Sequence, residues 1–493
     1  MNKLLRMLLS RTFFIFILFI AQLTLFFLLI DYIASFGYFN TIFYVISILI
    51  VVYMLYKEEN PVYKLSWIIP ILIFPLFGGL FYLFYQERNV SKRVLKRHKA
   101  IDLSREDYMK DIKNPLKTKD SVYLERLQWP TYEKTHVSFH PSGEELYEKM
   151  LEDIKHAKSY IFLEYFIINK GKMWDDILSL LKQKASEGVE IKIIYDDFGS
   201  STLPYHYPKK LKISNLEMIQ FNPMRLHINF AQNYRDHRKI AVIDGKIGYT
   251  GGINIGDEYI NLIKRYGHWH DAGIRLEGDA VWSLVIGFLE NWRFSTKKDI
   301  NYEDYYQKHE IDSKGFVIPF SDTPLDKETT IKNLYLSLIA SATKSIYITT
   351  PYLIIDNELL TALKYASKSG IDVSIIIPYV PDKKLIFMVT ESFLPELMDA
   401  GVKIYRYTPG FIHSKMMITD HQRALIGTAN LDFRSLYLHF ENMVYLEKND
   451  AIKDMVHFFL ETKEKSQFVD KRLHKNIIYK LIQIILRGFA TLM

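Results

Sequence analysis

Long apolar runs occupy the start of this chain, whereas the remainder mixes apolar and polar positions as globular domains do. Thr12–Ile33 carries no charge before Asp31, and Tyr38–Tyr56 is a second uncharged run of similar length. A helix of roughly 20 apolar residues is long enough to cross a bilayer. We therefore predict two transmembrane helices within residues 1–57.

Basic residues flank this pair of apolar runs. Lys3, Arg6 and Arg11 precede the first run, and Lys57 and Lys64 follow the second. Flanks rich in Lys and Arg stay on the cytoplasmic side, so both ends of the pair are predicted to be cytoplasmic and the short turn external. A cleavable signal peptide is disfavoured, because a second run follows at once.

A third apolar run, Trp67–Tyr85, conflicts with that topology. It is interrupted by two prolines and two glycines, which weaken a continuous helix, and a basic cluster follows at residues 88–99. A full crossing would place this cluster outside. We favour a re-entrant or interfacial segment, which makes residues 58–110 a membrane-associated segment and basic linker. Everything beyond it is predicted to be cytoplasmic.

Two stretches of the remaining chain repeat one order of predicted elements. Each has a helical stretch, a β-rich run, an amphipathic helix ending at a glycine, and a buried strand. The amphipathic helix is predicted over residues 174–186 in the first copy and 357–369 in the second. Strands alternating with helices indicate an α/β architecture with a largely parallel sheet. We predict two similar α/β halves around a pseudo-twofold axis, residues 111–310 and 311–470.

The C-terminal residues 471–493 form a basic amphipathic helix by their pattern. Apolar residues recur at helical spacing, at Ile477, Ile478, Leu481, Ile482, Ile485 and Leu486. Basic residues lie among them, at Lys471, Arg472, Lys475, Lys480 and Arg487. Periodicity does not separate a helix on a membrane surface from one packed on the enzyme body, so both interpretations stand.

Composition narrows the classes of function. The chain contains no cysteine, which excludes disulfides, thiolate zinc sites and cysteine nucleophiles. The formal net charge is +7, and much of the surplus flanks the predicted membrane segments. An anionic lipid surface is therefore favoured as a partner over nucleic acid.

One polar pattern occurs twice in the chain. The first copy comprises His237, Lys239, Asp244, Gly251, Gly252 and Asn254. The second copy comprises His413, Lys415, Asp420, Gly427, Thr428 and Asn430. A lone His-x-Lys is common and a single histidine on an apolar strand is usually structural. A repeat that keeps polar residues at the same offsets indicates chemistry instead, in one active site built by two halves.

These residue types suit a phosphodiester. One neutral imidazole can attack phosphorus while the other, protonated, gives its proton to the leaving alkoxide. Lysine ammoniums and asparagine amides can bind the non-bridging oxygens, and glycines let a large anion approach the backbone. Two ammonium charges make a metal unnecessary, so we assign neither metal nor cofactor.

Each catalytic histidine needs a partner that fixes its tautomer. Asp271 and Glu441 are candidates, each downstream of the histidine of its own half. Asp244 and Asp420 belong to the catalytic motif but are interpreted as structural anchors at the interface between the halves. Glu164, in a predicted strand, is counted as a supporting residue. Four further histidines are interpreted as near-site support or surface, namely His268, His270, His421 and His439.

The two motifs resemble the signature of the phospholipase D superfamily, HxKxxxxD followed by GSxN, twice. Gly252 and Thr428 stand where serine is usual. The sequence around the motifs resembles bacterial cardiolipin synthases, at residues 233–240, 251–259, 410–415 and 430–435. The paired apolar runs fit the same family, and the resemblance covers essentially the whole chain.

The resemblance implies a phosphatidyl transfer, in which two phosphatidylglycerol molecules give cardiolipin and glycerol. It implies that His237 forms a phosphatidyl-histidine and that His413 acts first as acid and then as base, in a multi-pass protein of the cell membrane. The symmetry of the halves leaves the order of the two histidines open. A phospholipase D or a phosphatidyltransferase with another acceptor is the alternative, followed by a nuclease and a non-catalytic membrane scaffold.

Overall fold

The structure is a computed structural model. It describes residues 24, 28, 37–57, 61–74, 78, 79, 82, 92–109, 112, 115–204, 206–211, 213–223, 234–309, 311–326, 328–470 and 476–492. Most of the first predicted span, 12–33, and the basic residues 471–475 lie outside the described residues. The chain divides into two compact units, residues 1–86 and residues 87–493.

The N-terminal unit contains two helices, α3 (Gly37–Tyr56) and α4 (Pro61–Ile73). Helix α3 coincides with the second predicted apolar run. A small buried cluster joins the two helices, made of Ile50, Met54, Trp67, Ile71 and Tyr82. Within the part of the chain that the structure describes, no helix has both the length and the apolar character that a membrane crossing needs.

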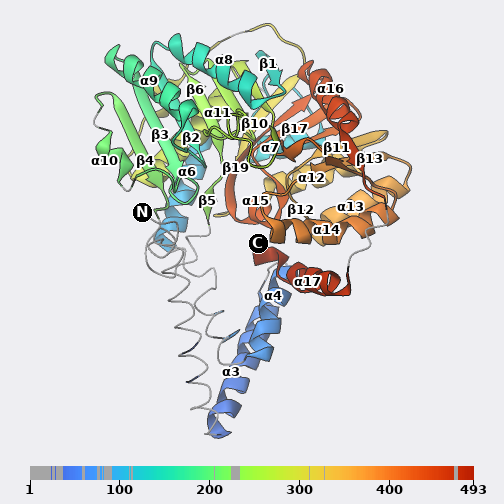
Figure 1. Cartoon of the computed structure of the whole chain (residues 1–493). Coiled ribbons are helices and arrows are strands. Elements are labelled where there is room, and N and C mark those ends of the chain that lie inside the picture. Colours follow the sequence, from blue (N-terminus) through green and yellow to red (C-terminus); the bar gives the residue numbers. More distant parts are fainter. Residues whose placement is uncertain are drawn as a thin grey trace, which may run out of the picture. The chain divides into compact units, whose positions relative to one another are not determined.

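The larger unit contains two sheets with the same strand order. The first is β1-β9-β7-β6-β2-β3-β4, and the second begins β10-β19-β17-β16-β11-β13-β14. The first sheet comprises β1 (Thr135–His140), β2 (Tyr160–Tyr165), β3 (Glu190–Asp196), β4 (Leu216–Phe221), β6 (Lys239–Ile243), β7 (Ile247–Gly251) and β9 (Gly273–Gly278). The second comprises β10 (Phe316–Asp322), β11 (Ser345–Thr349), β13 (Asp372–Pro378), β14 (Lys403–Tyr407), β16 (Met416–Thr419), β17 (Arg423–Gly427), β19 (His439–Glu447) and β20 (Ser466–Phe468). The prediction of two similar α/β halves is confirmed (Figure 1).

The sheets are mixed, so the expectation of a largely parallel sheet is wrong. Strands β2, β3 and β4 run parallel, because helices connect them. Strand β6 pairs antiparallel with β2 and with β7, and β7 pairs antiparallel with β9. The reason is local: the tight turn at Asp244 and Gly245, both at positive φ, returns the chain directly beside β6.

Helices cover the sheets, and two of these helices were predicted from the sequence. Helix α9 (Lys172–Ser186) and helix α13 (Asn357–Lys368) confirm the two predicted amphipathic helices. Gly188 and Gly370 follow them at φ +95° and +91°, as αL residues after a helix do. The remaining helices of the unit are α6 (Lys92–Met109), α7 (Lys119–Arg126), α8 (Gly143–Lys155), α10 (Tyr207–Lys210), α11 (Val281–Thr296), α12 (Thr330–Ser341), α14 (Lys384–Asp399), α15 (Phe433–Tyr437), α16 (Ala451–Glu464) and α17 (Ile477–Gly488), with 3₁₀ turns η3 (Tyr302–Tyr305) and η4 (Ala490–Leu492).

The two halves interlock rather than merely touch. Helix α11 of the first half packs against β10 of the second, and α16 of the second packs against β1 of the first. Short strands are also exchanged: β5 (Arg235–Asp236) pairs with β19, and β8 (His268–His270) pairs with β15 (Gly410–Ile412). A further short pair, β12 (Leu353–Ile354) with β18 (Leu431–Asp432), lies within the second half. The exchanged strands place the two motifs at one site.

Candidate active site

Each motif histidine lies between an exchanged strand and a central strand of its own sheet. His237 follows β5 and precedes β6, and its backbone N–H donates to the carbonyl of Phe440 at 2.9 Å. His413 follows β15 and precedes β16, and its N–H donates to the carbonyl of His270 at 2.7 Å. Both backbone bonds cross between the halves. The strand exchange therefore fixes each histidine against the other half.

The carboxylates that orient the histidines are crossed between the halves. His237 Nδ1 lies 2.9 Å from Glu441 Oε1 and 3.0 Å from Oε2. His413 Nδ1 lies 2.6 Å from Asp271 Oδ2. The expectation that each acid serves the histidine of its own half is wrong, because the exchanged strands carry each acid across. In both rings Nδ1 is engaged, which leaves Nε2 for chemistry.

Burial sets the charge state of these pairs. It lowers the pKa of His413 to about 4 and holds the pKa of His237 well below its ordinary value. Burial alone would raise the pKa of Glu441, but attraction and hydrogen bonding by His237 outweigh it and bring that pKa well below the usual range. Each site therefore holds a neutral imidazole on an ionised carboxylate.

The two motif lysines are buried and bind backbone carbonyls rather than carboxylates. Lys239 Nζ donates to the carbonyl of His237 at 2.5 Å, and Lys415 Nζ donates to the carbonyl of His413. Neither forms an ion pair with any residue that the structure describes. Burial lowers the pKa of Lys239 to about 8 and that of Lys415 to about 7. A phosphate would supply a directly bound negative charge.

The motif aspartates lie elsewhere. Asp244 accepts from the backbone N–H groups of Lys158, Ser159 and Tyr160 at 2.7–3.0 Å. Asp420 accepts from residues 343–345 in the same manner. The interpretation of both as structural anchors agrees with this geometry. Their expected place at the interface is wrong, since each caps the start of a strand in its own half.

The motif glycines make room for protein groups. A Cβ on Gly252 would lie 2.1 Å from Asp271 Oδ1 and 2.9 Å from the carbonyl oxygen of His413. Gly251 has φ +153°, and Gly427 lies against the carbonyl of Asn442, 2.4 Å from where a Cβ would stand. Close approach by an anion was the expected reason for these glycines. The structure shows that Gly252 leaves room for the Asp271–His413 pair, and that Gly251 and Gly427 lie against backbone atoms of residues 272–273 and 442–443. The approach of an anion to these glycines stays a prediction.

Thr428 takes the position opposite Gly252 in the repeat and gives one pair extra support. Its Oγ1 donates to Glu441 Oε2 at 2.5 Å. Asp271 receives a backbone N–H from Ala272 at 2.9 Å instead. The hydroxyl that the signature usually takes from serine thus comes from threonine in the second motif, and the first motif lacks one.

The two motif asparagines are held within loop networks. Asn254 Oδ1 accepts from the N–H of Ile167 at 3.1 Å, and its Nδ2 donates to Tyr259 OH at 2.8 Å. Asn430 Nδ2 donates to Asp432 Oδ2 at 3.1 Å. Each amide group has a second N–H, which is the donor available for a phosphate oxygen.

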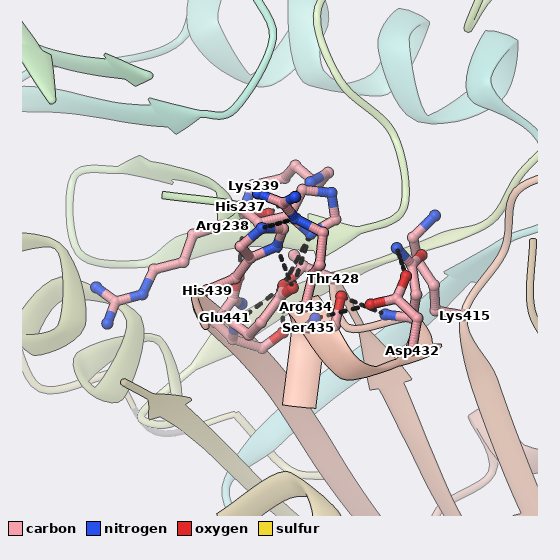
Figure 2. Close-up of polar contacts among 12 residues, drawn as sticks. His237, Arg238, Lys239, Lys415, Thr428, Asp432, Arg434, Ser435, His439 and Glu441 are labelled. Carbon is pink, nitrogen blue, oxygen red and sulfur yellow. Dashed lines mark hydrogen bonds and ion pairs between the residues drawn. The ribbon is translucent and has the colours of Figure 1, made fainter. Parts of the chain in front are cut away.

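Glu164 has no hydrogen bond or ion pair with His237 or His413 among the contacts that the structure describes. Its Oε1 accepts from Asn291 Nδ2 at 2.7 Å and lies 3.5 Å from Arg238 Nη1. Asn291 also donates to Asp236 at 3.0 Å. Burial raises the pKa of Glu164, and it raises that of Asp236 well above its ordinary value. This network holds Asp236 and Arg238, the two neighbours of His237 in the chain. Figure 2 shows Arg238 pointing away from the His237–Glu441 pair.

The surroundings of the two histidines differ, and sequence reasoning missed this. His237 contacts Phe166 and His439, with ring centroids 5.0 and 5.4 Å away. Arg434 Nε lies 3.3 Å from His439 Nε2, so this side is polar and basic (Figure 2). The interpretation of His439 as near-site support is confirmed.

Aromatic rings surround the other histidine. His413 contacts Trp269 and Tyr259, with centroids 5.0 and 5.6 Å away. Trp269 lies two residues before Asp271, as His439 lies two residues before Glu441. Trp269 and His439 occupy equivalent positions of the repeat, so comparing these two residues in the sequence would have predicted that the surroundings of the two histidines differ.

One group of side chains has the geometry of a cation site. Ligand atoms of His237, His439 and Glu441 lie within 4.8 Å of one another. The ammonium groups of Lys239 and Lys415 act on the same carboxylate, which opposes a further cation there. We assign no metal to this group.

Known protein families match this chain over both halves. The family described as cardiolipin synthase, phospholipase D-like domain, matches residues 150–264 and 335–462. The phospholipase D-nuclease N-terminal family matches residues 42–85. The first of these families matches twice, as the duplicated fold requires.

Individual proteins are similar to this chain over most of its length. Cardiolipin synthase 2 of Bacillus anthracis is 38% identical over 452 residues, which cover 87% of this chain and 88% of that protein. An uncharacterised protein of Streptococcus mutans is 40% identical over 459 residues, covering 90% and 99%. The crystal structure of Haemophilus influenzae phosphatidylserine synthase superposes with a TM-score of 0.59 at 15% identity, covering 76% of this chain and 98% of that one. At that identity the likeness shows the shared fold alone.

Proposed function

The chain belongs to the cardiolipin synthase family of phospholipase D-like proteins, and we propose how its two halves divide the steps of phosphatidyl transfer. The enzyme is a phosphatidyltransferase that converts two phosphatidylglycerol molecules into cardiolipin and glycerol. The observation that carries the mechanism is the crossed pairing of His237 with Glu441 and of His413 with Asp271. Two oriented imidazoles in one site can serve as nucleophile and as acid–base.

In the first step His237 Nε2 attacks the phosphorus of one phosphatidylglycerol, and the bond from phosphorus to the glycerol headgroup oxygen breaks. His413 donates its Nε2 proton to that oxygen, which releases glycerol. Burial lowers the pKa of the free His413 to about 4, so the proton is held only when the anionic phosphodiester and Asp271 face the ring together. Lys239 and Lys415 neutralise the non-bridging oxygens.

In the second step the terminal hydroxyl of another phosphatidylglycerol attacks the phosphatidyl-histidine. His413 Nε2, now neutral, accepts the hydroxyl proton, and the bond from phosphorus to His237 breaks. The product is cardiolipin, and His413 is protonated again for the reverse reaction. The transfer is reversible because the overall reaction exchanges one phosphodiester bond for another, through a phosphorus–nitrogen bond to His237.

His237 is our choice of nucleophile because its carboxylate is the more firmly held. Glu441 contacts Nδ1 with both oxygens and accepts from Thr428 as well. The test is to stop the reaction by denaturation at neutral pH, because the phosphorus–nitrogen bond hydrolyses in acid. The lipid adduct is then located by mass spectrometry in the His413→Ala variant supplied with a p-nitrophenyl phosphatidyl ester, whose leaving group needs no proton. We expect the adduct on His237. An adduct on His413 in the His237→Ala variant, with none on His237, would reverse the roles.

The choice of acceptor is tested with purified protein and phosphatidylglycerol alone. We expect cardiolipin and glycerol in equal amounts. Phosphatidic acid without cardiolipin would make the protein a phospholipase D, because water would then be the acceptor. Full function in the His237→Ala and His413→Ala variants would favour a non-catalytic scaffold.

We propose that residues 1–57 form two transmembrane helices and that residues 58–110 lead to catalytic halves 111–310 and 311–470 on the cytoplasmic side. The apolar runs and the N-terminal family match at residues 42–85 support this arrangement. Because the chain has no cysteine, single-cysteine variants can be labelled selectively. An impermeant maleimide should label Asn40→Cys on intact cells and leave Lys368→Cys unlabelled. The opposite pattern would invert the topology.

A further inference from the structure

The C-terminal helix α17 is attached to the catalytic unit by its polar side. Gln483 Nε2 donates to the carbonyl of Met388 at 3.1 Å, and Tyr479 OH donates to Glu391. Arg487 donates to the carbonyl of Ser392 at 3.2 Å and pairs with Glu396 at 3.3 Å. All four partners belong to helix α14. Tyr479, Gln483 and Arg487 follow one another at intervals of four residues, so they share one face of α17.

The opposite face of α17 is aliphatic and exposed. The exposed fractions are 73% for Ile477, 61% for Ile478, 55% for Leu481, 40% for Ile482, 68% for Ile484 and 61% for Ile485. An ordinary surface helix of a globular domain turns its apolar stripe toward the core. Helix α17 has the reverse orientation, since it presents its apolar stripe outward and binds the domain through polar side chains.

We propose that this outward face of α17 lies in the interfacial layer of a lipid bilayer. The face carries aliphatic side chains only, which suits acyl chains, and Lys480 lies at its margin where an ammonium can extend to anionic headgroups. The segment that leads into the helix, residues 471–475, adds three basic residues in the sequence. The substrate of the proposed reaction is an anionic membrane lipid, and the inference rests on that function for the choice of lipid over a protein partner.

Helix α17 is linked to the second motif by contacts through turn η4 and helix α15. Turn η4, which follows α17, packs on helix α15, and its Ala490 is 1% exposed. Asp432 caps α15 by accepting from the N–H of Ser435 at 2.8 Å and also binds Asn430 of the second motif. Helix α15 carries Arg434, beside His439. Bilayer contact by α17 would thus hold this edge of the site at the headgroup layer.

The experiment uses the full chain reconstituted in vesicles of phosphatidylglycerol and phosphatidylcholine. Leu481→Cys and Ile485→Cys are labelled with an environment-sensitive fluorophore. Tyr365→Cys is the control, because Tyr365 on α13 is a large exposed side chain, at 73%, and so at least as accessible as the two α17 positions. We expect nitroxide attached to lipid to quench the two α17 labels several-fold more than the control, and aqueous iodide to quench them less.

Two results would overturn the inference. Iodide quenching of the α17 labels equal to that of the control would place the face in water. Protection from both quenchers would place it against protein, either the N-terminal unit or a second copy of the chain. Cardiolipin formation measured in the same vesicles separates a failure of the inference from a failure of the proposed function.

A second variant tests the consequence for turnover. Leu481→Glu with Ile485→Glu should lower cardiolipin formation several-fold on vesicles but leave it near the wild-type level in detergent micelles, where substrate reaches the site without docking. Tyr365→Glu should change neither. An unchanged vesicle rate in the double variant would contradict a docking role.

Discussion

Glu441 of the second half is hydrogen-bonded to His237 of the first half through both carboxylate oxygens, at 2.9 and 3.0 Å. Asp271 of the first half binds His413 of the second in return, at 2.6 Å. Neither half alone contains an oriented histidine. The duplicated motif therefore makes one active site because each copy completes the other.

The crossed pairs predict which acid serves which step. Glu441→Gln should slow formation of the phosphatidyl-histidine on the order of 10³-fold or more, the scale on which an orienting carboxylate acts in a catalytic triad. Asp271→Asn should slow it similarly with phosphatidylglycerol but recover with a p-nitrophenyl leaving group, which needs no proton. Rapid-quench measurement of nitrophenol release distinguishes the two. Recovery in Glu441→Gln rather than Asp271→Asn would contradict the crossed assignment.

The hydroxyl of Thr428 should matter through Glu441. It donates to Oε2 at 2.5 Å, and a hydrogen bond to a charged group contributes roughly 1.5–3 kcal/mol. Thr428→Val keeps the shape and removes the donor, so kcat should fall by about 10-fold to 100-fold. Thr428→Ser, with the residue usual in the signature, is the control and should stay near wild type. Equal rates for both variants would show that the hydroxyl has no role.

Gly252 should not tolerate a side chain, although related motifs carry serine there. A Cβ would lie 2.1 Å from Asp271 Oδ1, so the carboxylate must move away from His413. Gly252→Ala should lower kcat and destabilise the fold by about 1–3 kcal/mol, as overpacking does. Gly488→Ala is the control, because no atom lies within 4 Å of its Cβ position. Thermal unfolding and initial rates measure both effects, and wild-type behaviour of Gly252→Ala would disprove the clash.

The buried lysines predict an alkaline limit to activity. Burial lowers the pKa of Lys415 from 10.5 to about 7 and that of Lys239 to about 8, so the free enzyme loses its ammonium charges as pH rises through this range. The ratio kcat/KM reports the free enzyme and should fall above pH 7. Lys415→Arg keeps its charge and should move the limit to higher pH.

The lowered pKa of the buried lysines affects stability in the opposite direction: activity should fall as pH rises, whereas the free energy of unfolding should increase. Between about pH 7 and 10.5 the unfolded chain holds a proton on Lys415 that the folded chain lacks. The free energy of unfolding should therefore rise with pH across this window. Urea unfolding at several pH values measures the slope, and Lys415→Met should reduce it. An unchanged slope in that variant would assign the effect to other groups.

Asp244 should be a residue of stability rather than of chemistry. It accepts from three consecutive backbone N–H groups, and its loss replaces these charged hydrogen bonds by bonds to water at best. Asp244→Ala should lower the free energy of unfolding by about 2–4 kcal/mol, whereas Asp244→Asn, which keeps one acceptor oxygen, should lose less. The rate per folded molecule at low temperature should remain near wild type. A soluble, folded but inactive Asp244→Asn would contradict the structural role.

Local patterns predicted the elements of this fold well. The two amphipathic helices were predicted from the spacing of their apolar residues, and their ends from the glycine that follows each. In the structure both glycines have φ near +90°, which other residues rarely adopt. The expectation of a largely parallel sheet came from the alternation of strands and helices, which describes β2, β3 and β4. It does not describe β6 and β7, because the tight turn at Asp244 and Gly245 returns the chain antiparallel. The orientation of α17 was equally open, since its periodicity fits either face toward the protein.

The sequence by itself determined the chemistry of this protein. Two histidines, two lysines and their repeated offsets indicate a phosphodiester site with a nucleophile and an acid, because these side chains have few other uses together. Only the tertiary structure decided how the site is assembled. Residues 237 and 441 are 204 positions apart, and residues 271 and 413 are 142 apart, and exchanged strands bring each pair together. Long-range pairing of this kind has no signature in local spacing. The sequence therefore suggested that each histidine pairs with the acid of its own half, whereas in the structure each pairs with the acid of the other half.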